Sequence, residues 1–502
     1  MPIRADWNAA SLSAKLYSRT WGKNEPGGVI IGFDPQGVKF AYAGGLESLA
    51  TGVPFTANTV VRYASITKHI FCTMVLRHAD VIGLSDRLGD HLPELQSPLA
   101  DVSVGRALDM TSGLPDVREC LTLLGLSVYT YTNAESLQEF LSTLNRLNFN
   151  AGSEISYSNT GYRLVEAAFE RKGLLFRDFV KSEVSDLLDT AIEVPDAWAD
   201  PVKGLAPGYW KSGNKWQESA AGLQLSASGS LAGSGMALTK WAQALLEEEG
   251  PFGGLLSNLS AERFLNDGRP TDYGLGLRWN EVGGKRFIGH GGSHPGYKSY
   301  FLLDPTEKTG MIVVSNREDA DTYKIARDGM AALNGLELPD TSCTIPDGLY
   351  VTETGPFWVE MREGVANYLG TEDRLYNIGK GSFSSLSPSS PIKLRWSNGV
   401  LQGEIGHVTR KLKTVTARPA GKEFDGRWNA PLYGASFVID NGHIIMGVGP
   451  TRQVMPLEDL GDGRALFTLR DGPWSKRICI HILDKDRLEL VLNRSRMIEY
   501  QR

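Results

Sequence analysis

Hydrophobic residues recur at helical spacing in two stretches of the first half of the chain. In VRYASITKHIFCTMVLRHAD, Ile66, Ile70 and Met74 fall on one face of a helix, which we expect to end before Gly83. Residues 236–249 (MALTKWAQALLEEE) show a second amphipathic pattern of the same period. The pattern therefore predicts at least two long surface helices that each bury one face.

Between residues 285 and 316 the pattern changes to short apolar runs separated by glycine or proline. The runs RFIGHGG, KSYFLLDP and MIVVSN predict three successive strands, which is typical of an antiparallel sheet. Helical and strand patterns are mixed throughout this part of the chain. We therefore expect residues 1–335 to form one α+β domain.

After Pro339 the chain shows only short strand patterns, separated by turn sequences such as DG, NG and GDG. Within this region IPDGLYVTE and EFDGRWNAP both place a DG turn before a bulky aromatic residue. Asp347 and Asp425 mark the same position in the two segments. The repeat predicts two similar β modules, residues 336–418 and 419–502, each long enough for a small closed barrel.

Length and composition agree with a protein of several domains. The chain has 502 residues, beyond the roughly 250–300 at which a single core stops growing. No apolar run approaches the roughly 20 residues that span a bilayer, and a formal net charge of −6 gives no basic surface for a polyanion. We therefore expect neither a membrane nor a nucleic acid as partner. The first twenty residues lack the apolar stretch of a signal peptide, which predicts a cytoplasmic location.

Cysteine and histidine spacing gives no metal motif. The four cysteines form no CxxC pair, so we expect buried free thiols at Cys72, Cys120, Cys343 and Cys479. His290 and His294 are four residues apart, but the glycines and proline around them exclude a helix that would bring both to one metal ion. GHGG completes no phosphate-binding motif either. The expectation is no metal and no cofactor.

Ser65 and Lys68 form a Ser-x-x-Lys pattern at the start of the first predicted helix. Positions i and i+3 share a helical face, so the lysine ammonium is within reach of the serine hydroxyl. A serine becomes a nucleophile when a neighbouring base takes its proton, and a lysine does this when burial or nearby cations lower its pKa. Matches to the same pattern that begin at Ser212 and Ser390 fall in a loop and before a strand. We interpret both as chance matches.

Two later segments suit a catalytic serine. In GSEISYSNTGY, the Tyr157 phenol is suited to relay a proton and the Asn159 amide to hydrogen-bond a substrate carbonyl. After His290, two glycines, of which Gly292 is the second, let a backbone come close to a ligand. A backbone N–H there, opposite the N–H of Ser65, would form an oxyanion hole. The three short patterns in this order indicate a serine hydrolase.

These patterns resemble the serine β-lactamase and penicillin-binding-protein superfamily. The resemblance lies in ASITKHIFCTMVLRHADVIGLSDRLGDHLPEL, ALDMTSGLPD, YSNTGY and GHGGSHPGY, and covers roughly the first 330 residues. The third motif of that superfamily is usually Lys-Thr-Gly, and here His290, Gly291 and Gly292 stand in its place. A His-x-Gly third motif with two trailing β modules is most similar to the bacterial D-aminopeptidases.

The resemblance implies a fold, a reaction and a set of partners. The fold is a five-stranded antiparallel sheet flanked by helices, followed by two eight-stranded antiparallel barrels. The reaction is hydrolysis of the amide after an N-terminal D-residue, with small residues such as D-Ala preferred. Small D-amino-acid peptides or amides are then the expected partners, and the sequence leaves open whether the chain forms a homodimer.

The same resemblance assigns roles to the motif residues. Ser65 would attack and carry the acyl group, which water then clears, while Lys68 and Tyr157 move protons. His290 would orient or protonate the site, and Asn159 would contact the substrate. Two other classes stay open: an esterase or D,D-peptidase on the same scaffold, and a ligand-binding homologue without turnover. The intact motif residues favour an enzyme.

An aminopeptidase also needs a carboxylate for the free α-ammonium of its substrate, and the three motifs supply none. In D-aminopeptidases a loop of the last barrel reaches into the active site. In LFTLRDGPWSKRICIHI, Asp471 stands in a turn between two strand patterns, and this turn is the closest match. The alternative interpretation of Asp471 is an ordinary hairpin turn.

Overall fold

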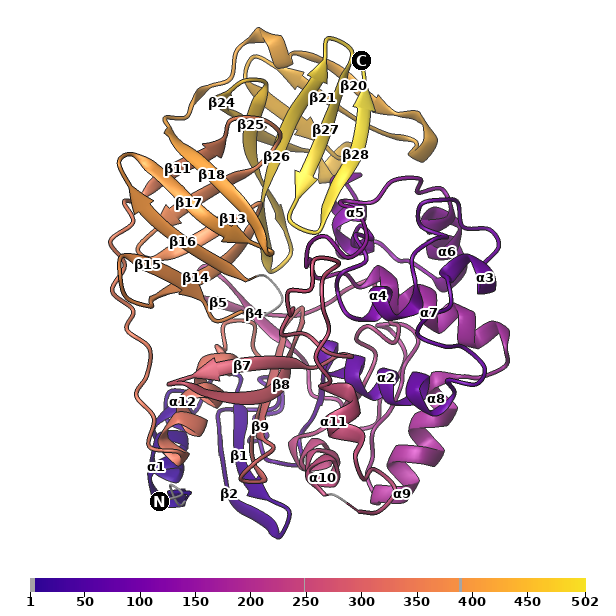
Figure 1. Cartoon of the computed structure of the whole chain (residues 1–502), viewed down its shortest axis with the longest axis vertical. Helices are drawn as coiled ribbons and strands as arrows, with labels where there is room; N and C mark the ends of the chain where they lie inside the picture. Colours follow the sequence, from indigo (N-terminus) through magenta and orange to yellow (C-terminus); the bar gives the residue numbers. More distant parts are fainter. Residues whose placement is uncertain (1–4, 248, 388–390) are drawn as a thin grey trace.

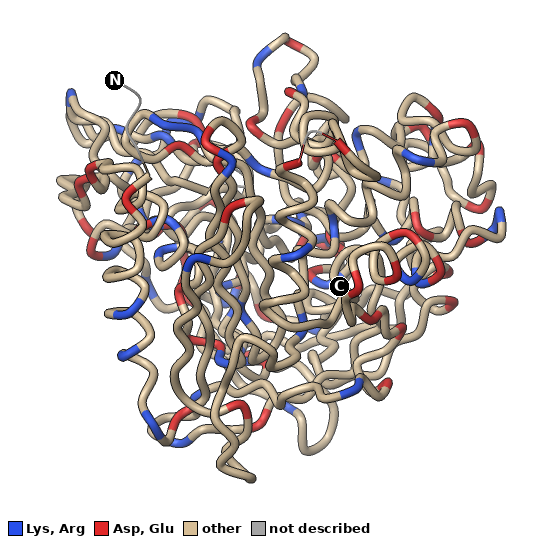
Figure 2. Tube along the Cα trace, turned by 90° about the horizontal axis from the view of Figure 1, so that it is seen from below, with Lys and Arg blue, Asp and Glu red and all other residues tan. Residues whose placement is uncertain are grey.

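The computed structural model describes residues 5–247, 249–387 and 391–502. Figure 1 shows the helices and the antiparallel sheet of the N-terminal part in the lower half of the view, with the two β modules side by side above them. No helix in the described part of the chain is long and apolar enough to cross a membrane. Basic and acidic residues are interspersed along the trace in Figure 2.

An antiparallel sheet of six strands organises the N-terminal region, in the order β2-β1-β10-β9-β8-β7. The three strands predicted between residues 285 and 316 are confirmed as β8, β9 and β10, which pair in succession. The implied count of five strands is one too low, because β7 extends the edge beyond β8. The bounds are β1 Gly28–Asp34, β2 Gly37–Gly44, β7 Arg278–Val282, β8 Lys285–His294, β9 Tyr297–Asp304 and β10 Thr309–Ser315.

The sheet is covered by helices on both faces, so its strands are buried on both sides. In β1, Val29 and Ile31 join the large core under the helices that carry the motifs, whereas Ile30 joins a smaller core on the opposite face. Helices α1 (Trp7–Ser18) and α12 (Thr322–Leu333) cover that second face. This alternation follows from the two-residue period of a strand.

The predicted helices are confirmed with shorter bounds. A 3₁₀ turn at Ala64–Ile66 leads into α2, and the second predicted helix is α10, while Glu248 of that prediction lies outside the described residues. The helices on the motif side are α2 Thr67–Arg77, α3 Leu88–His91, α4 Val104–Leu108, α5 Val117–Leu123, α6 Ala134–Ser142, α7 Thr160–Arg171, α8 Phe176–Phe179, α9 Asp186–Leu188, α10 Gly235–Leu246 and α11 Leu255–Leu259. Two small sheets pair β3 (Val60–Arg62) with β6 (Ala232–Ser234) and β4 (Tyr209–Ser212) with β5 (Lys215–Glu218).

The first β module is a closed antiparallel barrel of eight strands. It closes because β11 pairs with β12 on one side and with β18 on the other. Its strands are β11 Gly348–Thr352, β12 Trp358–Arg362, β13 Val365–Tyr368, β14 Thr371–Asn377, β15 Ser382–Ser385, β16 Ile392–Ser397, β17 Val400–Ile405 and β18 Val408–Val415.

The second module is a nearly closed barrel of ten strands rather than the implied eight. The order is β19-β24-β25-β26-β27-β28-β20-β21-β22-β23, so β19 and β23 are its edges. Its strands are β19 Arg418–Pro419, β20 Gly426–Ala430, β21 Ala435–Asp440, β22 His443–Met446, β23 Gln453–Pro456, β24 Glu458–Gly461, β25 Arg464–Asp471, β26 Trp474–Asp484, β27 Arg487–Leu492 and β28 Ser495–Gln501.

The sequence repeat has a structural counterpart at the start of each module. Gly348 opens β11 with a φ of 147° and Gly426 opens β20 with a φ of 149°. Tyr350 and Trp428 each donate a side-chain hydrogen bond to the carbonyl oxygen four residues earlier, at 2.6 and 3.0 Å. The repeated DG-x-aromatic segment therefore builds the same strand start twice.

The remaining sequence patterns are structural. Three cysteines are buried free thiols as expected, and Cys343 is only half-buried. The chance match at Ser212 lies in the exposed hairpin of β4 and β5. Ser390 lies outside the described residues, and its partner position Lys393 lies in β16.

Candidate active site

Ser65 lies in a strained turn that packs directly on the central sheet. The residue before it, Ala64, has a φ of 51°, a conformation that is costly for a residue with a Cβ and that clusters at functional sites. The Ser299 hydroxyl of β9 donates to the Tyr63 carbonyl at 2.9 Å. A Cβ on Gly292 of β8 would lie 2.0 Å from that same carbonyl oxygen. Gly292 is therefore a glycine because the Ser65 turn occupies the space of its side chain.

Lys68 is fully buried one turn after Ser65. Its Nζ lies 3.2 Å from the Ser65 Oγ, 2.9 Å from the Asn159 Oδ1 and 2.6 Å from the Ser228 carbonyl oxygen. Burial lowers the pKa of Lys68 well below its ordinary value, and the positive charge of Arg118 lowers it further. A neutral amine has two N–H groups and one lone pair. The amide and carbonyl oxygens accept the two N–H groups, which leaves the lone pair for the Ser65 proton.

Tyr157 lies beside this pair and is surrounded by cations. The Lys68 Nζ lies 4.8 Å from the centre of the Tyr157 ring, and the Cζ of Arg494 and of Arg278 lie 4.7 and 5.6 Å from it. Burial raises the pKa of Tyr157, an effect that Arg278 and the Ser65 hydroxyl oppose. The phenol is therefore a neutral proton donor held close to the nucleophile.

Asn159 is fixed by Asp116, a residue that lies outside the three active-site motifs. The Asp116 Oδ2 accepts hydrogen bonds from the Asn159 backbone N–H and from its Nδ2, both at 2.8 Å. The Asp116 Oδ1 caps α5 by accepting from the backbone N–H groups of Arg118 and Glu119. Asn159 thus holds Lys68 through its oxygen and is held by Asp116 through its nitrogen. The signal for Asp116 was its place in ALDMTSGLPD.

His290 lies behind the pocket wall rather than on its surface. It is fully buried, its Nδ1 lies 2.6 Å from the Gly291 carbonyl oxygen, and its Nε2 lies 3.0 Å from the Tyr273 hydroxyl. Because a carbonyl only accepts, Nδ1 carries the proton and Nε2 accepts from Tyr273. Burial lowers the pKa of His290 well below its ordinary value, as do Arg278 and Lys68. The imidazole is therefore neutral and lies behind the residues that line the cavity. His294 contacts the Gly229 carbonyl instead of sharing a site with His290.

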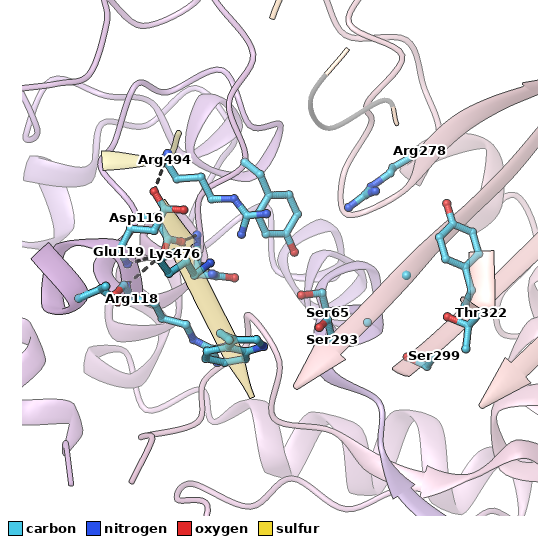
Figure 3. A pocket seen from close by; sticks show the side chains of 17 residues that line it. Ser65, Asp116, Arg118, Glu119, Arg278, Ser293, Ser299, Thr322, Lys476 and Arg494 are labelled. Carbon is cyan, nitrogen blue, oxygen red and sulfur yellow. Dashed lines mark hydrogen bonds between the residues drawn. The ribbon is translucent and has the colours of Figure 1, made fainter. Parts of the chain in front are cut away.

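A cavity of about 360 Å³ opens in front of Ser65 and is shown in Figure 3. Asn159 and Gly292 line it, together with Ser293, the next residue of β8. Its other walls come from α5, from the start of β7, from β9 and the start of α12, and from the second barrel. The barrel contributes Trp474, Lys476 and Arg494. The cavity thus combines residues separated by more than 400 positions in the sequence.

The family follows from this geometry and from the sequence match. Residues 14–334 match the family described as Beta-lactamase, and this stretch is more than half of the 502-residue chain. The matched stretch contains the nucleophile turn, the Lys68 contact and the glycine-rich strand β8. The chain belongs to the beta-lactamase family.

Distant relatives carry related names. This beta-lactamase-family chain is similar to a D-aminopeptidase of Gluconobacter oxydans (strain 621H), at 26% identity over 345 residues. That match covers 66% of this chain and 64% of the relative, which is less than two thirds of the relative's length.

Two solved structures share the fold. The octameric penicillin-binding protein homologue from Pyrococcus abyssi covers 99% of both chains, with a TM-score of 0.57 and 16% identity. The D-amino acid amidase from Ochrobactrum anthropi SV3, solved with D-phenylalanine, covers 65% of this chain and 98% of its own, with a TM-score of 0.55 and 18% identity.

Asp471 does not line the cavity of this beta-lactamase-family site. Its carboxylate accepts from the Ser127 hydroxyl at 2.6 Å and from the Val128 backbone N–H at 2.7 Å. The hairpin between β25 and β26 does reach the site, but with Trp474 and Lys476 rather than with a carboxylate. Asp471 therefore anchors the hairpin, and the structure gives it no contact with the cavity.

The cavity is rich in cations that lie in no sequence motif. Arg118 of α5, Arg278 of β7, Lys476 of β26 and Arg494 of the β27–β28 turn all line it. Figure 3 shows Arg118, Lys476 and Arg494 on one side of Ser65 and Arg278 on the other. Burial lowers the pKa of both Arg118 and Lys476. These residues belong to no local motif, and only the fold brings them together.

Carboxylates near these cations are already engaged or partly protonated. Asp116 accepts the four N–H bonds described above, and the Glu119 Oε2 accepts from the Arg494 backbone N–H at 2.7 Å. Asp373 of β14 lies close enough for Arg278 and Arg494 to lower its pKa, but burial outweighs them and raises that pKa to about 7. Burial raises the pKa of Glu119 as well.

Proposed function

We propose that this protein is a serine hydrolase that cleaves the amide bond next to a D-amino acid through an acyl-enzyme on Ser65. The observation that carries the proposal is the contact between the Lys68 Nζ and the Ser65 Oγ at 3.2 Å, made by a fully buried lysine whose pKa is lowered. Such a lysine is a more effective base than an exposed one, because a lowered pKa makes its neutral form more accessible.

The reaction would begin with proton transfer from the Ser65 hydroxyl to the lone pair of Lys68. The Ser65 Oγ then attacks the substrate carbonyl carbon, and the Tyr157 phenol is placed to pass a proton to the departing amine. Loss of the amine leaves an ester on Ser65. Lys68 then passes its proton to the Tyr157 phenolate, which restores both neutral groups. A water molecule deprotonated by Lys68 hydrolyses the ester and frees the acid, and the proton returns to the Ser65 oxygen.

Two parts of the site would stabilise the charge that develops on the substrate oxygen. The Ser65 backbone N–H lies in the 3₁₀ turn, and the β8 residues Gly291, Gly292 and Ser293 border the cavity beside it. We assign the oxyanion hole to the Ser65 N–H and an N–H of this β8 edge. His290 would act as a positioning residue, since its neutral ring packs against Tyr157 at 6.2 Å between ring centres.

Selectivity for D-residues is supported by the names of the relatives: a D-aminopeptidase at 26% identity and a D-amino acid amidase with the same fold. Recognition of a free α-ammonium, which the family resemblance implies, stays a prediction. The carboxylates that line the cavity, Asp116 and Glu119, both already accept hydrogen bonds from the protein.

A stereochemical comparison tests the proposal. D-alanine amide and L-alanine amide would be incubated with the protein and with Ser65→Ala, and ammonia release would be followed. We expect turnover of the D-amide, at least 10-fold slower turnover of the L-amide, and none by Ser65→Ala. Equal rates for both enantiomers would contradict the D-selectivity, and D-amide turnover by Ser65→Ala would contradict the mechanism.

A further inference from the structure

The cavity in front of Ser65 holds more positive charge than its own residues neutralise. Within the described residues, no carboxylate oxygen lies within ion-pair distance of the side-chain nitrogens of Arg118, Arg278, Lys476 or Arg494, although ion pairs are common elsewhere in the chain. Neighbouring Arg477, for comparison, pairs with Glu360 and Glu458 at 3.1 and 2.8 Å. Cations placed together in a cavity without partners are unfavourable until an anion joins them.

The carboxylates of the cavity balance only part of this charge. Asp116 and Glu119 attract Arg118 and Lys476, but two carboxylates line the cavity against four cations, and both are held by N–H groups of the protein. Asp373 approaches from the first barrel, but with a pKa of about 7 it is only partly ionised at neutral pH. The position for a full negative charge is therefore left for a ligand.

Three of the four cations form one cluster, which we call the cation wall: Arg118, Lys476 and Arg494. The wall is built by α5 together with the β25–β26 hairpin and the β27–β28 turn of the second barrel. In Figure 3 it stands across the cavity from Arg278, with Ser65 between the two. An anionic group of a substrate bound to Ser65 would therefore meet the wall on one side of the scissile bond.

We propose that the substrate of this site carries a free carboxylate that binds the cation wall, so that the natural substrates are acidic rather than neutral or cationic. This inference rests on the proposed function, because it concerns the molecule that acylates Ser65. Arginine and lysine bind a carboxylate through charge-assisted hydrogen bonds, which are about twice as strong as neutral ones. The carboxylate belongs either to the acyl half, as in D-glutamate or D-aspartate, or to the leaving half, as at the C-terminus of a dipeptide.

Two matched pairs of substrates separate these sources. The acyl-half pair is the p-nitroanilide of D-glutamate against that of D-glutamine, which differ by one charged group at nearly equal size. The leaving-half pair is D-alanyl-D-alanine against its C-terminal amide. We expect kcat/KM to be about 10- to 100-fold higher for the acidic member of at least one pair, the worth of one charged hydrogen bond.

Lys476→Met tests the wall itself, because methionine keeps the length of the side chain and removes its charge. The preference for the acidic member should fall about 10-fold in this variant. The matched control is Lys485→Met, at the far end of the same β26–β27 hairpin, where the side chain is 89% exposed and should leave the preference unchanged. If Lys476→Met does not fold, inhibition of the wild-type protein gives the second measurement. D-glutamate should then inhibit turnover of D-alanine amide at least 10-fold more strongly than D-glutamine.

The possible outcomes distinguish a failure of this inference from a failure of the proposed function. Equal kcat/KM within both pairs, with D-alanine amide still turned over through Ser65, would overturn the carboxylate proposal and leave the hydrolase standing. No turnover of any amide by the wild-type protein would contradict the proposed function itself.

Discussion

Lys68 illustrates how the surroundings of one residue set its chemistry. An exposed lysine is protonated at neutral pH, but this one is fully buried, and the residues that the structure describes place no carboxylate on its Nζ. Its two permanent partners, the Asn159 amide oxygen and the Ser228 carbonyl oxygen, are neutral acceptors. Burial and the charge of Arg118 lower the pKa, and the attraction of Asp116 only partly opposes them. The result is a base directed at Ser65.

Replacing Lys68 by arginine should remove this base without removing the positive charge. Arginine does not give up its proton in proteins, so we expect Lys68→Arg to lower kcat/KM by about 100- to 10,000-fold. In the wild-type protein kcat/KM should rise with pH through the lowered pKa of Lys68 and level off above it, because only the neutral lysine accepts a proton.

The control for this variant is Lys181→Arg, at an exposed position where the side chain is 76% accessible. It should behave as the wild-type protein. A pH profile of kcat/KM measured for all three proteins checks the prediction. If Lys68→Arg keeps more than a tenth of the activity, the base is a different group, and Tyr157 is the first candidate.

Local sequence was enough to place Ser65, Lys68, Tyr157 and Asn159 in one site, because each lies in a short pattern with its own spacing. It was not enough for Lys476 and Arg494, whose place in the cavity depends on how the second barrel packs. The same limit applied to Asp471. A turn sequence shows that a loop is exposed, but not which of its side chains faces the site.

At the scale of elements, the β25–β26 hairpin connects the second barrel to the active site. Asp471 holds its tip to Ser127 and Val128, and Trp474 donates to the Glu318 Oε1 at 3.2 Å on the opposite rim. With both sides of the tip fixed, Lys476 is held against the cavity. The anchored hairpin therefore sets the position of Lys476 in the cavity wall.

Loss of the Asp471 anchor should affect all substrates alike. Asp471→Ala removes both hydrogen bonds to residues 127 and 128, and we expect kcat/KM to fall by about 10-fold for free-amine amides, for acylated amines and for simple esters. Asp486→Ala, in the β26–β27 turn, is the matched control and should change none of the three. A loss confined to free-amine substrates would instead place Asp471 on the substrate ammonium.

Element boundaries show where sequence patterns reach their limit. The amphipathic helices were predicted because their period is clear, and the three central strands because their apolar runs are separated by glycine or proline. The sixth strand of the central sheet, β7, was not predicted, because it is only five residues long. It joins the sheet through a hairpin at Gly283 and Gly284 that pairs it with the edge of β8. The count of ten strands in the second module could not be predicted either. A strand of two residues such as β19 has no period to detect.

At the scale of the whole molecule, the second barrel and the N-terminal region share one interface. Cys120 and Leu123 of α5 belong to the hydrophobic core of the second barrel. The Arg494 carbonyl accepts from the Asp116 backbone N–H at 2.7 Å. Nearby, Glu154 and Arg496 form a buried ion pair at 2.7 Å, with both side chains 6% exposed. The cavity therefore exists only where the barrel is docked.

Breaking the buried pair should loosen this docking. Arg496→Met leaves the Glu154 carboxylate buried beside the more distant Arg410, at 3.7 Å, and we expect a loss of about 3–5 kcal/mol in the free energy of unfolding. Adding Glu154→Gln should recover part of that loss, because it removes the uncompensated charge. Urea unfolding of the single and double variants measures both steps.

Arg487→Met is the matched control for Arg496→Met, because Arg487 lies on the neighbouring strand in an exposed pair and should cost less than about 1 kcal/mol. If Arg496→Met is no less stable than this control, the buried pair does not hold the barrel in place. The cation wall would then need another explanation for its position.

The most direct test of the account is the identity of the acylated residue. The protein would be mixed with an excess of a D-alanine ester, quenched in acid during turnover and digested with trypsin, which releases residues 63–68 (YASITK) as one peptide. We predict that this peptide gains the mass of one alanyl group on Ser65, and that Ser65→Ala gains none. An acyl group found on any other residue, or steady turnover with no acylated peptide at any time, would contradict the account.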